Sequence, residues 1–308
     1  GAKNQATKSS YTESSMVSVA ARLNYAYKER YMATVTVRAD ASSRFAKGNR
    51  WGWFPSAALA WRMSEEDFLK DVEWLTNAQI KLSTGTSGNS SIPDYDHLAL
   101  VSGNANYNDE AGIFPLQSGN EKLGWEQTWA NNVGFTLGLF NRVNVNVDFY
   151  HKKTTNILMY VPTSYAITGE GYRWENIGAM MNRGVEVAVD GNVIHTKDFT
   201  WNLSANFSYN KNKLLELYNG VEEYVNSTTG LKYMVGHPTT EFFLNRYAGV
   251  NPANGDALWY TADGELTTEF RQEDKVMTGK TFDRRNGQGR QGFTVHETAV
   301  SQVEKAAG

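Results

Sequence analysis

The sequence contains no cysteine, and it lacks any long apolar run. Without cysteine, the chain has no disulfide framework, no thiolate metal site and no cysteine nucleophile. No stretch approaches the roughly 18 apolar residues that a membrane-spanning helix requires, so a helical membrane protein is excluded. A membrane β-barrel is not excluded, because its strands alternate apolar and polar side chains and therefore contain no such run.

A strong charge of either sign is also missing. Lys and Arg total 30 against 33 Asp and Glu, so the formal net charge is -3 and no positive field attracts a phosphate backbone. Nucleic acid is therefore not expected as a partner. Aromatic residues reach 13% while charged residues stay at 20%, a composition that favours an ordered fold. The length of 308 residues suits one large domain or two ordinary ones.

Eight segments alternate apolar and polar side chains with a period of two. In residues 199–210, for example, every odd position is apolar or aromatic and every even position is Thr, Asn or Ser. This period is that of a β-strand with one apolar and one polar face, and consecutive segments predict antiparallel hairpins. The segments are residues 17–27, 31–38, 51–62, 75–84, 125–139, 143–149, 185–193 and 199–210.

The connections between these segments alternate in length. Short links are predicted at residues 28–30, 140–141 and 195–198, and long ones at 87–124, 155–181 and after 211. Short and long connections therefore fall at opposite ends of the sheet. The link at 63–74 lies at the end of the sheet that carries the short connections. Ser64 is predicted to cap one helical turn there, with Asp67 three residues after it.

A sheet with one apolar face fits either a soluble sandwich or a membrane barrel. The predicted strands are longer than the roughly 5 to 6 residues usual in soluble proteins and match the roughly 9 to 11 that a tilted membrane strand needs. Aromatic residues also gather at strand ends, as Tyr27, Trp61 and Trp125 do, which is typical of an interfacial girdle. The pattern favours the barrel. A soluble or surface-attached β-sandwich that binds carbohydrate is the alternative, and an extracellular β-rich hydrolase domain is a third possibility.

Eight strands with further β-like material at 241–250 and 257–261 predict an all-β fold, an antiparallel up-and-down transmembrane β-barrel. Since a lone edge strand would expose unpaired backbone groups to lipid, the predicted structure is an arc of about 8 to 10 strands of a larger barrel. The rest of the wall is expected from sequence outside this chain.

Short motifs occur in a fixed order between residues 11 and 283. They are Arg38, Asp40, Ser42, Ser43 and Phe45; Phe54, Pro55 and Ser56; Trp61 and Arg62 with Ser64, Glu65, Glu66 and Phe68; Ser83, Thr84 and Gly85 with Gly88 and Asn89; Asn120, Leu123, Trp125, Glu126 and Thr128; Asn176, Gly178, Asn182, Gly184 and Glu186; Phe199, Trp201, Asn206, Ser208 and Asn210; and Gly249, Val250, Asn251, Pro252 and Gly255. In this order they resemble the C-terminal part of the barrel of SusC/RagA-type TonB-dependent outer-membrane transporters. Ala41 departs from the family pattern, which has glycine there.

The resemblance implies a cell outer-membrane nutrient importer rather than an enzyme. Such transporters have a barrel of about 22 strands with a plugged lumen, and a SusD-like lipoprotein covers the outer mouth. Energy comes from the inner-membrane proton gradient through the TonB complex, so no nucleotide or other cofactor is implied. The implied cargo is a glycan fragment or a peptide, and the implied surroundings of the wall are outer-membrane lipid.

The resemblance also implies a division of the chain. Residues 1–10 are expected to be a disordered leader, residues 11–283 a partial TonB-dependent receptor β-barrel domain, and residues 284–308 an atypical polar tail that is disordered. The plug and the segment that engages the TonB complex are expected from N-terminal parts outside this chain. A truncated or frame-shifted reading is the expected origin of this division.

No catalytic, cofactor-binding or metal-binding residue is predicted, and no substrate-binding residue is assigned. The histidines lack the spacing of metal ligands, and the acidic run at residues 65–67 is explained by its place in the first turn of a helix. The glycine motif at residues 287–292 lacks the preceding strand and the following helix of a dinucleotide site. The oxygen-rich loop at residues 254–264 is explained more simply by turns than by a calcium site. Aromatic residues of the long connections are candidates for stacking on sugar rings or for packing between loops. These sets are His97, His151, His195, His237 and His296; Glu65, Glu66 and Asp67; Gly287, Gly289 and Gly292; Asn254, Asp256, Asp263 and Gly264; and Tyr95, Tyr107, Phe114, Tyr165, Tyr172 and Trp174.

Overall fold

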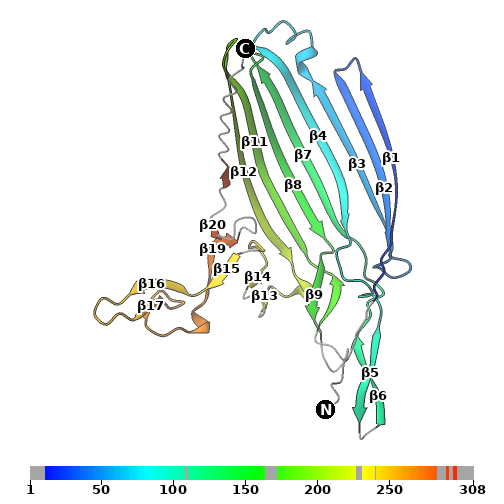
Figure 1. Cartoon of the computed structure of the whole chain (residues 1–308), viewed down its shortest axis with the longest axis vertical. Helices are drawn as coiled ribbons and strands as arrows, with labels where there is room; N and C mark the ends of the chain where they lie inside the picture. Colours follow the sequence, from blue (N-terminus) through cyan, green and yellow to red (C-terminus); the bar gives the residue numbers. More distant parts are fainter. Residues whose placement is uncertain are drawn as a thin grey trace, which may run out of the picture.

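The computed structural model describes residues 11–107, 110–163, 172–226, 231–239, 241–282, 289–290 and 294–296. Its main element is a nine-stranded antiparallel sheet of eight long strands and the short β21 (Figure 1). Among the described residues, no helix has the length and apolar character that crossing a bilayer would require. The sheet order is β1 (Met16–Tyr27), β2 (Tyr31–Ser42), β3 (Trp51–Arg62), β4 (Leu75–Asn89), β7 (Glu126–Leu139), β8 (Val143–Thr155), β11 (Ala179–His195), β12 (Thr200–Glu216) and β21 (Thr294–His296).

The eight strands predicted from alternation are all present, and the antiparallel order of an arc is confirmed. Five of them, β2, β4, β8, β11 and β12, run clearly further than the alternation indicates, and β11 and β12 reach 17 residues each. β1 and β2 pair without interruption from Tyr27 with Tyr31 to Met16 with Ser42. These lengths exceed the roughly 9 to 11 residues that a tilted strand needs to cross a bilayer.

The predicted alternation of short and long connections is also confirmed. In Figure 1 the short links lie at the upper end of the sheet, here called the turn end, and the long ones lie at the lower end, the loop end. Two of the short links place positive φ at both central residues, Lys28 with Glu29 and Phe140 with Asn141. That is the geometry of a type I′ turn, whose twist matches the twist of the strands it joins.

The link between β3 and β4 contains a helical turn, as predicted, but the predicted cap is wrong. A 3-10 turn, η1 (Met63–Glu65), begins one residue before Ser64, and Arg62 precedes it without a side-chain capping bond. Asp67 forms an ion pair with Lys70 at 2.9 Å instead of closing the turn. Ser64 does not cap this turn because residues of β2 and β3 contact Glu66, as described below, and these contacts hold the link in place.

The long connections fold into small sheets of their own, which alternation did not indicate for residues 87–124 and 155–181. The strands predicted near 241–250 and 257–261 are present, but they belong to these small sheets and not to the large one. The small sheets are β5 (Leu100–Tyr107) with β6 (Glu110–Gln117); β9 (Leu158–Pro162) with β10 (Tyr172–Asn176); β13 (Glu223–Asn226) with β14 (Leu231–Met234); β15 (Glu241–Leu244) with β19 (Val276–Phe282) and β20 (Gly289–Arg290); and β16 (Arg246–Val250) with β17 (Ala257–Tyr260) and β18 (Leu266–Thr267). Two further 3-10 turns are η2 (Tyr218–Gly220) and η3 (Gln272–Asp274).

The large sheet keeps one face apolar across all eight long strands. One row of directly paired residues is Tyr27, Tyr31, Trp61, Ile80, Phe135, Val147, Val187 and Phe207. A row on the other face is Asn24, Thr34, Ala58, Ser83, Asn132, Tyr150, Gly184 and Asn210. The apolar side chains stay open to the surroundings in the part of the chain described, with Leu23 70% and Leu59 57% exposed, so no second sheet covers them as a sandwich requires.

Candidate functional site

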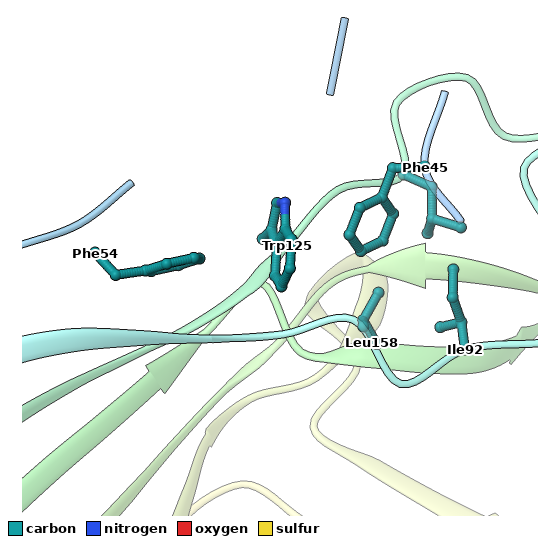
Figure 2. Packing of buried hydrophobic residues seen from close by; sticks show 6 residues of the cluster. Phe45, Phe54, Ile92, Trp125 and Leu158 are labelled. Atoms are coloured by element: carbon teal, nitrogen blue, oxygen red, sulfur yellow. The ribbon is translucent and has the colours of Figure 1, made fainter. Parts of the chain in front are cut away.

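The buried core lies at the loop end and not under the sheet. Phe45, Phe54, Ile92, Leu123, Trp125 and Leu158 form a cluster, here called the rim cluster, to which three separate connections and the strands β3 and β9 contribute. Figure 2 shows Trp125 between the rings of Phe54 and Phe45, with ring centroids 5.3 and 5.4 Å away and edge-to-face geometry. Such aromatic contacts fix ring orientation as well as burying area. The rim cluster therefore packs these loops against one another at the loop end of the sheet.

Asparagine side chains fasten the same loops to one another. Asn176 accepts a hydrogen bond from the Gly124 amide at 2.6 Å and donates one to the Gly124 carbonyl at 2.8 Å. Asn120 donates to the Trp174 carbonyl at 2.9 Å, and the Trp125 indole donates to the Arg50 carbonyl at 2.7 Å. These bonds satisfy backbone groups that irregular loops leave unpaired. Asn120, Trp125 and Asn176, which belong to the motifs quoted above, thus act as architecture of the loop end.

Charged residues line a hollow of about 530 Å³ next to the rim cluster. Arg38 pairs with Asp40 at 2.8 Å, and Arg44 pairs with Asp94 at 2.9 Å. Asp40 is 6% exposed, so Arg38, and not water, stabilises its negative charge. This hollow offers neutralised pairs and hydroxyl groups, which can bind a polar solute but supply no proton-transfer group.

A second hollow, of about 310 Å³, lies between the β9–β10 hairpin and the chain around Asp96 and Gln117. Its aromatic wall is formed by Tyr160, Tyr172 and Trp174. The Tyr160 ring lies 5.4 Å from that of Tyr172 at an interplanar angle of 20°, and 5.6 Å from that of Trp174. Two of the loop aromatics named from the sequence, Tyr172 and Trp174, are therefore brought together.

The other loop aromatics named from the sequence do not join this wall. The Tyr95 hydroxyl accepts a hydrogen bond from the Glu13 amide at 3.0 Å, and Phe114 lies on β6 with 42% of its surface exposed. Tyr165 lies outside the described residues, as does the side chain of Tyr107. Tyr160 was missed because its five-residue strand is too short for the period of two to be counted.

The histidines named from the sequence stay apart. His195 lies 3.1 Å from the Thr200 hydroxyl, His237 lies 3.0 Å from Glu241, and His97 is buried at the base of the β5–β6 hairpin. His151 is on β8, and the side chain of His296 lies outside the described residues. No group of three or more His, Asp or Glu side chains arranged to hold a metal occurs within the described ranges.

The remaining sequence candidates fall in turns. Asn254 donates to Asp256 at 2.6 Å within the β16–β17 connection, and Gly264 has a positive φ of 94° in the next turn. Such contacts belong to turn chemistry. Of the glycine motif, Gly287 and Gly292 lie outside the described residues, and Gly289 is in β20.

Glu66 is the most connected side chain of the turn end. Its two oxygens accept hydrogen bonds from the Tyr31 hydroxyl at 2.6 Å, the Trp61 indole at 3.0 Å and Arg30 at 3.2 Å. The pKa of Glu66 lies below its ordinary value, chiefly because Tyr31 and then Trp61 donate to the ionised form. The acidic run at 65–67 therefore has a structural role, in which Glu66 ties β2 and β3 to their link.

Comparison with known proteins places this arrangement in a family. The family model described as TonB dependent receptor-like, beta-barrel, matches residues 1–300. TonB-dependent receptor P39 of Formosa agariphila is 41% identical over 207 residues, 67% of this chain and 20% of that protein. TonB-dependent receptor SusC of Bacteroides thetaiotaomicron is 35% identical over 270 residues, 80% of this chain and 26% of that protein.

A solved structure, that of the RagAB peptide transporter, has the same fold. It superposes with a TM-score of 0.79 at 33% sequence identity and covers 87% of this chain. The match extends over 30% of that structure's chain. The chain thus spans about a fifth to a third of the length of the relatives it matches.

Proposed function

Because this chain belongs to the TonB-dependent receptor β-barrel family and is part of an outer-membrane receptor of the SusC/RagA type, we propose that its receptor imports oligosaccharide fragments of glycans. Short peptides are the second candidate cargo. Proteins of this family transport and do not catalyse, and the fold of this chain is a portion of their barrel.

The observation that carries the proposal is the division of the sheet into two faces. A row of eight apolar or aromatic residues crosses one face, and a row of small and polar residues crosses the other. In a receptor of this family, an apolar row facing acyl chains and a polar row facing the lumen make a wall around an aqueous path. Such a wall suits passage of a hydrophilic solute.

The resemblance to SusC/RagA-type transporters supports the glycan cargo, and similarity to the RagAB peptide transporter supports the peptide. On the same family resemblance we assign the receptor a SusD-like lipoprotein at the loop end, where the small sheets lie. Contact with the TonB complex is assigned to N-terminal parts of the receptor, and residues 11–283 are assigned to the barrel domain.

An uptake experiment tests this function. Cells whose receptor gene is deleted, or restored with the intact gene, receive fluorescently labelled oligosaccharides or labelled short peptides, with and without a protonophore. We expect energy-dependent uptake of oligosaccharide only in the restored cells, with the receptor recovered in the outer-membrane fraction. Equal uptake in deleted and restored cells, or uptake that survives the protonophore, would refute the proposal. Restored uptake of peptide alone would establish the second candidate.

A further inference from the structure

Aromatic rings at the loop end continue beyond the β9–β10 hairpin. On the neighbouring β13–β14 hairpin, the Tyr224 ring lies 6.3 Å from that of Tyr233 at an interplanar angle of 13°, and 5.7 Å from that of Tyr218. Burial is the main cause that raises the pKa of Tyr224 above its usual value. Each hairpin thus carries its own group of rings, and the two groups together are here called the aromatic strip: Trp174, Tyr160 and Tyr172 on the β9–β10 hairpin, and Tyr224 and Tyr233 on the β13–β14 hairpin with the adjoining Tyr218.

The aromatic strip differs from the rim cluster in exposure. Phe45 and Trp125 of the rim cluster are 0% and 8% exposed, whereas Tyr160 and Tyr172 are 55% and 41% exposed. Aromatic rings that hold fixed mutual angles while remaining open to solvent form a preformed surface for a flat apolar ligand face. Tyr160 and Tyr172 therefore present a surface in contact with solvent, whereas Trp174 packs against the rim cluster and Tyr218, Tyr224 and Tyr233 are half-buried.

Two of the cations beside the strip are paired with acidic side chains. Arg173, which lines the 310 Å³ hollow, is paired with Glu175, and Lys232 on β14 is paired with Glu223 at 2.8 Å. The Gln117 side chain, which also lines the hollow, donates to loop carbonyls at 2.9 and 3.0 Å and is thereby held in place. A surface of stacked rings with paired charges and amide groups suits a neutral ligand that has many hydroxyl groups.

We propose that the aromatic strip binds an oligosaccharide through successive sugar rings, and this inference rests on the proposed import function. A pyranose presents axial C–H bonds on its face, which lie against an aromatic ring, and hydroxyl groups at its edge, which bond to amide, carboxylate and phenol groups. Several rings on each hairpin provide repeated stacking positions. The first group is tested at its exposed ring Tyr172, and the second at Tyr224, which contacts both Tyr218 and Tyr233.

Binding by the purified full-length receptor in detergent tests the assignment. The probes are maltohexaose, cellohexaose, xylohexaose and laminarihexaose, with hexa-alanine as the peptide probe, measured by isothermal titration calorimetry. We expect at least one hexasaccharide to bind, and Tyr172→Ala and Tyr224→Ala each to weaken it by up to about tenfold, as expected for loss of one aromatic contact. Tyr172→Phe and Tyr224→Phe keep the ring and should stay within about threefold of the wild type.

Tyr247→Ala is the matched control, because Tyr247 is an exposed ring on β16 that contacts Trp259 outside the strip. Heat-modifiable migration in gels confirms that every variant is folded. Binding of no hexasaccharide, or equal weakening by Tyr172→Ala and Tyr247→Ala, would overturn the assignment. Binding of hexa-alanine that depends on Tyr172 would overturn it in favour of a peptide. If the cellular assay shows oligosaccharide uptake while strip variants bind and import normally, the inference fails and the importer function stands.

Discussion

At the scale of single residues, two glycines make room for one aromatic ring at the loop end. A Cβ atom on Gly52 would lie 2.5 Å from the Phe54 ring and 3.0 Å from Trp125, and one on Gly88 would overlap the Phe54 ring. The ring of Phe54 thus lies directly over bare backbone of β3 and β4. Since a well-packed ring has no space to retreat, we predict that Gly88→Ala destabilises the folded receptor by about 1 to 3 kcal/mol through overpacking.

The measurement is urea unfolding of the receptor in lipid vesicles, followed by tryptophan fluorescence. Gly103→Ala is the matched control, because a Cβ atom at Gly103 on β5 would meet no atom within 4 Å. Phe54→Ala should remove part of the effect of Gly88→Ala, since the two atoms nearest to the new Cβ belong to the Phe54 ring and the third, 2.8 Å away, belongs to Trp125. Strictly additive effects of the two substitutions would show that the overlap with Phe54 is not the cause.

At the scale of elements, the sequence predicts a strand where apolar and polar residues alternate over enough positions for the period of two to be counted. Residues 199–210 alternate without a fault, and β12 contains all but the first of them. β9 and β10 have only five residues each, so their pairing depends on contacts such as Tyr160 with Trp174 that no local period reveals. Ser64 failed as a cap because Tyr31 of β2, which is distant in sequence, and Trp61 of β3 donate to Glu66 and fix the link instead. Phe45, Phe54, Leu123 and Trp125 of the rim cluster lie in the sequence motifs. Ile92 and Leu158 do not, and the geometry of the cluster was not predictable because it combines residues far apart in the sequence.

The link between β3 and β4 should respond to pH through Glu66. Its pKa is lowered in the folded protein, so the stabilisation it provides is present above the ordinary carboxyl range and is lost as the pH falls through the lowered value. We predict that Glu66→Gln speeds amide hydrogen exchange in residues 28–31 and 63–70 at pH 7. The difference from the wild type should shrink as the pH falls below about 4.

Exchange rates for this comparison are corrected for the intrinsic effect of pH and read by mass spectrometry. Glu65→Gln is the control, since it removes the same charge one residue earlier, within η1. If Glu65→Gln changes exchange as much as Glu66→Gln, general charge and not the contacts of Glu66 would explain the result. A difference that persists unchanged at low pH would contradict the role of the ionised carboxylate.

At the scale of the whole molecule, the two faces of the arc must differ in the side chains they tolerate. Val147 lies in the middle of the apolar part of β8, paired with Phe135 and Val187, whereas Asn144 lies on the opposite face, paired with Gly138 and Asp190. In lipid, an arginine on the outward face near the bilayer midplane costs about 2 to 4 kcal/mol. We therefore predict that Val147→Arg lowers the stability of the receptor in vesicles by this amount. Asn144→Arg should change it by less than about 1 kcal/mol, because the new cation faces water and the Asp190 carboxylate. Heat-modifiable migration and urea midpoints measure both variants, and an equal loss in the two would mean that the apolar rows do not face acyl chains.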